Sequence, residues 1–245
     1  MNLLLVDRAE LVDGVVRLGD RRAVHLRAVM GVTVGQVVRA GVVGGGLGPA
    51  VVTAIAADAI ELAIDLAALA PAPPPAPIAL VLAVPRPKVL ARTLEIAAAF
   101  GVERIELVNA WRVDKAYLGS PRLAPAELAA HVRLGAEQGV TTHLPPVRVH
   151  PRLMGFLDGA PPIAPGGRGL CAHARGGVAI ERAPGVATAP TTLAIGPEGG
   201  WIEREVETFA ARGFAIVSLG DAVLRVEAAV AGALAQLALL ARLAA

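Results

Sequence analysis

Two glycine-containing turns near the end of the chain are the segments best suited to bind a small molecule. Residues 196–200 (Gly-Pro-Glu-Gly-Gly) follow the apolar run 191–195, and Gly220-Asp221 follows the apolar run 214–219. Glycine lets the backbone approach a ligand closely and leaves N–H and C=O groups free to bond it. Neither GxxxxGK[ST] nor GxGxxG spacing is present, which argues against a P-loop and a dinucleotide fingerprint. Backbone contacts of this kind would suit an uncharged ring such as adenosine.

Three glutamates accompany the first turn. Glu198 could orient a substrate or a partner loop, or it could form a structural hydrogen bond to the second turn. Glu203 and Glu205 fall in the first turn of an expected helix over 201–212, where acidic side chains stabilise the positive end of the helix dipole.

Basic side chains gather at two places. Arg86, Lys88 and Arg92 surround the start of an expected helix, where cations oppose the helix dipole, so an external anion such as RNA phosphate is one explanation and a solvated helix face is the other. The helix expected over 21–30, with Asp20 as its N-cap, carries a second basic cluster that is predicted to face outward. The side chains of this second cluster are Arg21, Arg22, His25 and Arg27.

Other catalytic chemistry finds no support in the sequence. The five histidines lack metal-ligand spacing and cysteine partners, and there is no GxSxG elbow. The single Cys171 sits in an apolar run, which indicates a buried structural thiol and a reducing compartment.

The element pattern divides the chain in two. Residues 1–70 contain short β signals separated by glycines, which predicts a small barrel or curled antiparallel sheet. Residues 71–77 form a proline-rich linker. In 78–245, strands alternate with helices, which predicts an α/β domain built on a parallel sheet. Parallel strands that end in the two glycine turns would place both turns at the ligand-binding edge of that sheet.

Composition does not show whether the protein binds nucleic acid. The net charge is +2 and only Lys88 and Lys115 are lysines, but high arginine beside high Ala, Gly and Pro also reflects a GC-rich genome. The longest uncharged stretch is broken by prolines, so we expect a soluble, cytoplasmic protein without a membrane segment.

The motifs resemble those of the RsmE family of 16S rRNA (uracil N3) methyltransferases, which belong to the SPOUT superfamily. The resemblance rests on Ala-Ile-Gly-Pro-Glu-Gly-Gly at 194–200, Val-Ser-Leu-Gly at 217–220 and Leu-Arg-Val-Glu-Ala-Ala at 224–229. It extends to Pro-Arg-Pro-Lys at 85–88, to 109–117 and to Glu137-Gln138, and so covers nearly the whole chain.

The resemblance implies a PUA-like β-barrel domain over 1–70 that helps to hold RNA. It also implies a SPOUT domain with a trefoil knot over 78–245, a homodimer, and S-adenosylmethionine bound in the knot. The cofactor-binding residues implied are Leu107, Ile195, Gly196, Pro197, Gly200, Ser218, Leu219, Gly220 and Leu224. The RNA-binding residues implied are Arg22, His25, Arg27, Arg86, Lys88, Arg92 and Lys115.

For catalysis, the resemblance points to Arg225 or Arg112 for stabilising the uracil anion, and to Glu198 as the best candidate for the base. Two alternatives stand beside it: a SPOUT enzyme acting on another RNA or on a ribose hydroxyl, and a catalytically weak RNA-binding protein of ribosome assembly. The chain departs from the family pattern at 29–31, at 139–143 and at 227–229, while the cofactor motifs are intact.

Overall fold

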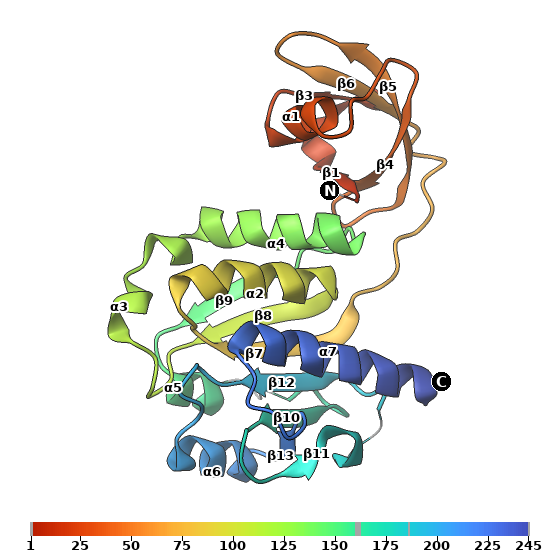
Figure 1. Ribbon diagram of the computed structural model, residues 1–245. Helices are drawn as coiled ribbons and strands as arrows, with labels where there is room; N and C mark the ends of the chain where they lie inside the picture. Colours follow the sequence, from red (N-terminus) through yellow and green to blue (C-terminus); the bar gives the residue numbers. More distant parts are fainter. Residues whose placement is uncertain (1, 160–162, 186, 245) are drawn as a thin grey trace. The chain divides into compact units, whose positions relative to one another are not determined.

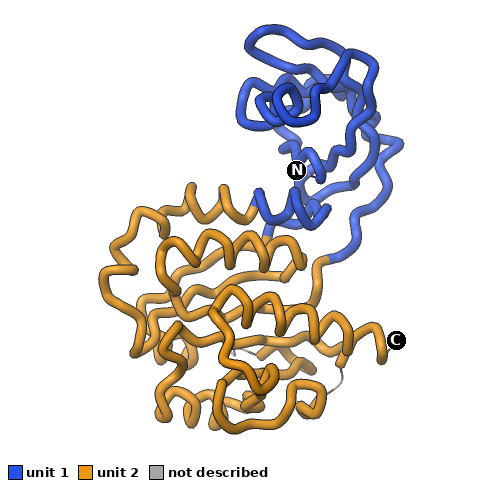
Figure 2. Tube along the Cα trace, in the orientation of Figure 1, with its two compact units in different colours: residues 1–74, 133–144 blue, residues 75–132, 145–245 orange. Residues whose placement is uncertain are grey.

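The computed structural model describes residues 2–159, 163–185 and 187–244, and these fall into two compact units (Figures 1 and 2). The first unit comprises 1–74 and 133–144, and the second comprises 75–132 and 145–245. The first boundary falls inside the predicted linker. The segment 133–144, in contrast, belongs to the first unit although the sequence placed it in the second domain.

The first unit is a six-stranded curled sheet in the order β1-β4-β5-β6-β3-β2, as the β signals predicted. All neighbouring strands are antiparallel except β1 and β4, which are parallel. Alternating side chains of the sheet, together with Leu26 of helix α1, form its core. The strands are β1 (Leu4–Val6), β2 (Leu11–Val12), β3 (Val15–Leu18), β4 (Val37–Val42), β5 (Leu47–Ile55) and β6 (Ile60–Ile64).

Helix α1 (Arg21–Ala28) begins at the predicted N-cap, because the Asp20 carboxylate accepts a hydrogen bond from the backbone N–H of Arg22. It ends before Gly31, whose φ of +59° suits glycine.

Ion pairs and hydrogen bonds hold the segment 133–144 in the first unit. The carboxylate of Glu137, which is 1% exposed, accepts two hydrogen bonds from the guanidinium of Arg21 at 2.7 and 2.8 Å. Arg133 pairs with Asp7 at 2.6 Å. Sequence periodicity could not predict this assignment, because the partners lie more than 100 positions apart.

The second unit contains a seven-stranded parallel sheet in the order β11-β13-β10-β12-β7-β8-β9, which confirms the predicted parallel architecture. Its central strands are largely apolar and almost wholly buried, as expected for strands covered on both faces. The strands are β7 (Ala76–Ala83), β8 (Val102–Val108), β9 (Val147–His150), β10 (Arg168–Ala172), β11 (Val178–Ala179), β12 (Thr191–Ile195) and β13 (Phe214–Ser218). The sequence missed the edge strands β9 and β11, which are short and largely exposed.

Helices α2 and α7 lie side by side in this unit (Figure 1). Pro87 starts α2, where its fixed φ suits the first helical turn. The α-helices after α1 are α2 (Pro87–Ala99), α3 (Lys115–Leu118), α4 (Pro125–Gly139), α5 (Leu153–Asp158), α6 (Glu203–Ala211) and α7 (Val226–Leu243). Short 3₁₀ turns occupy Arg8–Glu10, Pro121–Leu123 and Ile180–Arg182.

Helix α7 is long and apolar enough to cross a membrane by length and composition alone. Its buried residues are Val226, Val230, Ala233, Leu234 and Leu237, which recur at helical spacing along one stripe. A stripe of this kind is typical of a helix that packs on a domain core.

The strand order sets the position of the ligand edge. β10 lies between β12 and β13, so the carboxyl ends of three adjacent parallel strands meet there. The two glycine turns are therefore separated by a third loop, the one that follows β10.

Candidate functional site

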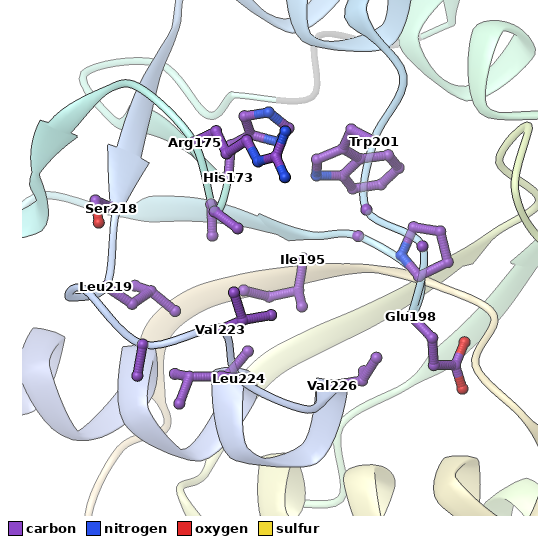
Figure 3. A pocket seen from close by; sticks show the side chains of 18 of the residues that line it. His173, Arg175, Ile195, Glu198, Trp201, Ser218, Leu219, Val223, Leu224 and Val226 are labelled. Carbon is purple, nitrogen blue, oxygen red and sulfur yellow. The ribbon is translucent and has the colours of Figure 1, made fainter.

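A cavity of about 590 Å³ opens at this edge of the second unit, a volume typical of small-molecule sites (Figure 3). It is bounded by the loops that follow β10, β12 and β13, by the start of α7 and by Arg112. The lining residues are Arg112, Ala172, His173, Ala174, Arg175, Ile195, Gly196, Pro197, Glu198, Gly199, Gly200, Trp201, Ser218, Leu219, Gly220, Ala222, Val223, Leu224, Val226 and Ala229.

Most of the predicted cofactor-binding residues lie together in this cavity. Those that line it are Ile195, Gly196, Pro197, Gly200, Ser218, Leu219, Gly220 and Leu224. Leu107 does not line it: it lies in β8 with a fully buried side chain. β8 is separated from β12 by β7, so its end is not adjacent to the glycine turns.

The loop after β10 supplies a wall that the sequence interpretation missed. His173 and Arg175 line the cavity, and Figure 3 shows their side chains close together on the side that also carries Trp201. Their only signal in the sequence is their place at the end of the predicted strand 169–173: His173 is its last residue, and Arg175 follows two positions later. That signal becomes informative once β10 is known to lie between β12 and β13.

Trp201 forms an aromatic wall of the cavity and explains why residue 196 is glycine. A Cβ on Gly196 would lie 3.2 Å from the backbone nitrogen of Trp201 and 3.3 Å from its ring. The indole is 2% exposed and packs edge-on against Phe209, at 5.0 Å between ring centroids. Its Nε1 is a buried donor without a hydrogen-bond partner among the described residues, which is costly unless a ligand or water satisfies it.

Glu198 connects the first glycine turn to the start of α2. Its carboxylate accepts a hydrogen bond from the backbone N–H of Arg86 at 3.0 Å and lies 3.9 Å from the Arg86 guanidinium. Figure 3 shows this side chain directed away from Trp201 and His173. An internal carboxylate thus lies beside Arg86 at this helix start, where the sequence left an external anion and a solvated helix face as alternative explanations for the cations. Within the described part of the chain, the Glu198 carboxylate accepts no hydrogen bond from the second turn.

Arg112 lies across the same turn and donates a hydrogen bond to the carbonyl of Gly199 at 2.5 Å. A Cβ on Gly199 would lie 3.1 Å from Cδ of Arg112, so the glycine leaves room for this side chain. Arg112 lines the cavity, and its positive charge can stabilise a negative charge there.

Glu205 has a definite structural role. It is 2% exposed, and its two carboxylate oxygens accept hydrogen bonds from the backbone N–H groups of Trp111 at 2.8 Å and Ile202 at 3.0 Å. It therefore caps α6, as its position predicted, and also holds the loop that carries Arg112.

The remaining predicted residues of the second unit lie on its surface. Arg225 is the exposed N-cap of α7 and does not line the cavity, although both of its neighbours do. Arg86, Lys88 and Arg92 are exposed at the start of α2, and Lys115 is exposed in the first turn of α3.

In the first unit, the prediction that Arg22 faces outward is wrong. Arg22 is 6% exposed and donates hydrogen bonds to Glu10, Asp20 and the carbonyl of Leu5. Its charge neutralises nearby carboxylates, which a pattern of basic residues on a helix could not reveal. Arg27 is exposed and donates to the carbonyl of Ala56, and His25 is half-buried.

Cys171 is buried in β10, as predicted, and burial raises the pKa of its thiol. It is therefore a structural residue and not a nucleophile at neutral pH. Among the described residues, no group of His, Cys, Asp and Glu side chains could hold a metal ion.

The fold and the cavity define an α/β protein that binds a small molecule at the carboxyl edge of a parallel sheet. The RNA methyltransferase domain model matches residues 72–238, and the chain belongs to this family of enzymes. The resemblance inferred from the glycine motifs is confirmed.

Relatives extend the similarity over the whole chain. The ribosomal RNA small subunit methyltransferase E of Treponema pallidum is 27% identical over 239 residues, which are 96% of this chain and 90% of that protein. A ribosomal RNA small subunit methyltransferase E from Neisseria gonorrhoeae, solved with bound S-adenosyl methionine, is 23% identical with a TM-score of 0.78 and covers 98% of both chains. A methyltransferase from Legionella pneumophila, solved with the cofactor SAM, is 20% identical with a TM-score of 0.77 and covers 96% of both chains.

Proposed function

We propose that this protein uses S-adenosylmethionine to methylate N3 of a uridine in 16S ribosomal RNA. The observation that carries the proposal is the cavity itself, where the two glycine motifs of an RNA methyltransferase meet at one sheet edge. The proposed RNA follows from the names of the relatives that match over nearly the whole chain. The proposed methyl donor follows from the S-adenosyl methionine bound in one of them.

The residues present fit this cofactor. The glycine turns bring backbone groups to the cavity without side chains, which suits the edges of an adenine and a ribose. Trp201 offers an apolar wall and an unbonded indole N–H. Residues 196–200 and 219–224 would hold the nucleoside and the methionine part.

S-adenosylmethionine supplies an electrophilic methyl group when it is bound. The protein must then place uracil N3 in line with that group and favour loss of the N3 proton, because N3 is protonated at neutral pH. Arg112 is the best-placed residue for stabilising the resulting anion, since it lines the cavity and its guanidinium is fixed on Gly199. We assign no residue as the base that removes the N3 proton. The Glu198 carboxylate is directed away from Trp201 and accepts a hydrogen bond from the Arg86 N–H.

Arginine, lysine and histidine side chains of both units would contact the RNA backbone. Arg86, Lys88, Arg92 and Lys115 in the second unit, with His25 and Arg27 in the first, are accessible or partly accessible. Arg22 is not among these proposed RNA contacts, because its guanidinium is paired with Glu10 and Asp20.

We also infer a knotted SPOUT domain, a homodimer and a cytoplasmic location from the family resemblance. In support, Gln236 of α7 donates a hydrogen bond to the carbonyl of Leu219 at 3.0 Å, which fixes the terminal helix against the second turn. The apolar residues Leu239 and Leu243 remain exposed on α7 and would be covered in a dimer. Sedimentation equilibrium should give twice the chain mass, and a monomer would contradict the dimer.

Two measurements test the proposal. Calorimetry should detect binding of S-adenosylmethionine and S-adenosylhomocysteine, and binding of neither would leave an RNA-binding assembly protein. Small-subunit rRNA from cells with and without the gene should then differ in N3-methyluridine. If cofactor binds but this nucleoside is unchanged, the enzyme acts on another RNA or another atom.

A further inference from the structure

The indole of Trp111 is the most exposed aromatic side chain among the described residues. It is 79% exposed, whereas the other tryptophan, Trp201, is 2% exposed and the exposed Phe100 reaches 40%. Aromatic residues make up only 3% of the chain, so this protein uses few of them and leaves one in solvent. A single exposed apolar residue is ordinary by itself. Trp111 is distinguished by the way its backbone is anchored.

The backbone at Trp111 is anchored on both sides. Its N–H donates to the buried carboxylate of Glu205 at 2.8 Å. The flanking residues Ala110 and Val113 are 5% and 6% exposed, and a backbone hydrogen bond of 3.1 Å joins them in a turn. The exposed indole therefore stands on a fixed turn and is not part of a loose loop.

The same turn reaches the cavity. Arg112, the next residue, lines it and bonds to Gly199. Glu205 ties the backbone of Trp111 to the first turn of α6, which begins two residues after Trp201. The backbone of Trp111 is thus fixed next to a residue that lines the cavity, with the cations Arg112 and Lys115 near it in the sequence.

We propose that Trp111 is a stacking surface for an unpaired base of the RNA substrate at the mouth of the methyl-donor cavity. The inference rests on the proposed function. A uracil must leave its own stack before its N3 can reach a methyl group, and an exposed indole can replace the lost stacking on one face of a base. An indole does this for any base, so Trp111 would contribute affinity and positioning, and not base identity.

The test compares Trp111→Phe, Trp111→Leu and Trp111→Ala with the wild type. Phenylalanine keeps an aromatic face, leucine keeps only apolar surface, and alanine removes both. On unmethylated small ribosomal subunits, we expect kcat/KM to fall about tenfold or more for Leu and Ala, the size of one base–aromatic contact, and much less for Phe. Cofactor affinity by calorimetry and thermal stability should stay close to wild type in all three.

Two outcomes would overturn the proposal: a kcat/KM for Trp111→Leu equal to that of the wild type, or a Trp111→Phe variant as impaired as Trp111→Ala. Filter binding of unmodified 16S rRNA to the same four proteins separates this inference from the proposed function. A wild type that transfers no methyl group would contradict the function, whereas the order of RNA affinities would still answer the stacking question.

Discussion

Gly196 and Trp201 illustrate how single residues determine the shape of the cavity. The glycine is required less by its own backbone angles than by the neighbouring indole, which occupies the space of a side chain. Trp201 cannot retreat easily, because it packs on Phe209, and Phe209 packs on Phe214 at 5.0 Å. The sequence interpretation explained this glycine by close approach of the backbone to a ligand, and it missed the contact with Trp201 that also favours glycine here.

We expect Gly196→Ala to lower both cofactor affinity and stability. The new Cβ would push on Trp201, at a cost of about 1–3 kcal/mol in a packed site, and would shift the cavity wall. Calorimetry with S-adenosylmethionine and thermal unfolding measure the two effects. Gly155→Ala is the matched control, because a Cβ there meets nothing within 4 Å. Unchanged cofactor affinity in Gly196→Ala would show that this wall does not contact the ligand.

Charged residues were harder to interpret from sequence than glycines. Arg22 and Arg27 lie on the same helix and look alike in the sequence. Arg22 is nevertheless buried in ion pairs, whereas Arg27 is exposed. The difference comes from Glu10, which lies in a 3₁₀ turn before the helix and meets Arg22 through the fold. A charge pattern along one helix carries no information about such a partner.

At the scale of elements, Glu198 joins two of them: the loop after β12 and the N-terminus of α2. Its position in a glycine turn suggested catalysis, but its geometry gives it a positioning role. The carboxylate supplies an acceptor for a helix N–H and a negative charge at the positive end of the helix.

Substitution of Glu198 distinguishes a positioning role from a role as catalytic base. Glu198→Gln keeps an acceptor for the Arg86 N–H, so we expect it to retain most methyl transfer. Glu198→Ala removes the acceptor and should destabilise the protein by about 1 kcal/mol and lower turnover by disordering the turn. A catalytic base predicts the opposite, with Gln as inactive as Ala and a changed pH profile of kcat. Turnover across the pH range therefore decides between them.

Strand order explains which part of the cavity the sequence could predict. The residues of the two glycine turns were found because glycine and an adjoining apolar run are local signals. The wall of His173 and Arg175 depends on β10 pairing with both β12 and β13, which is a long-range property. Leu107 was assigned to the cofactor site from the family resemblance, but it does not line the cavity, because β8 pairs with β7 and β9.

At the scale of the whole molecule, the two units differ in how they are stabilised. The second has a parallel sheet whose central strands are largely apolar and buried, whereas the first combines its small core with an ion-pair network around Arg22. The hydrogen bond from Arg22 lowers the pKa of Glu10 below its ordinary value of 4.5. A carboxyl group with a lowered pKa stabilises the fold fully above its unfolded pKa, and this contribution disappears as the pH falls through the folded pKa.

We therefore expect the first unit to lose stability below about pH 4.5 in a way that depends on Glu10. Glu10→Gln should be less stable than wild type at neutral pH, and the difference should shrink as acid protonates the wild-type carboxyl group. Thermal unfolding from neutral pH to about pH 3 measures this difference. A gap between the two proteins that stays constant with pH would contradict the role given to the carboxylate.

The segment 133–144 also determines how this protein can be divided. Ala136 lies in a small core with Leu3 and Leu5, and Val140 and Leu144 pack against it. The chain thus passes between the two units three times, so a protease that cut within 71–77 would leave them covalently joined. A gene fragment that stops at residue 74 would encode a first unit with part of its interior missing. Any transfer of the first unit to another protein must carry the later segment with it, so the two units cannot be exchanged independently by recombination at a single point.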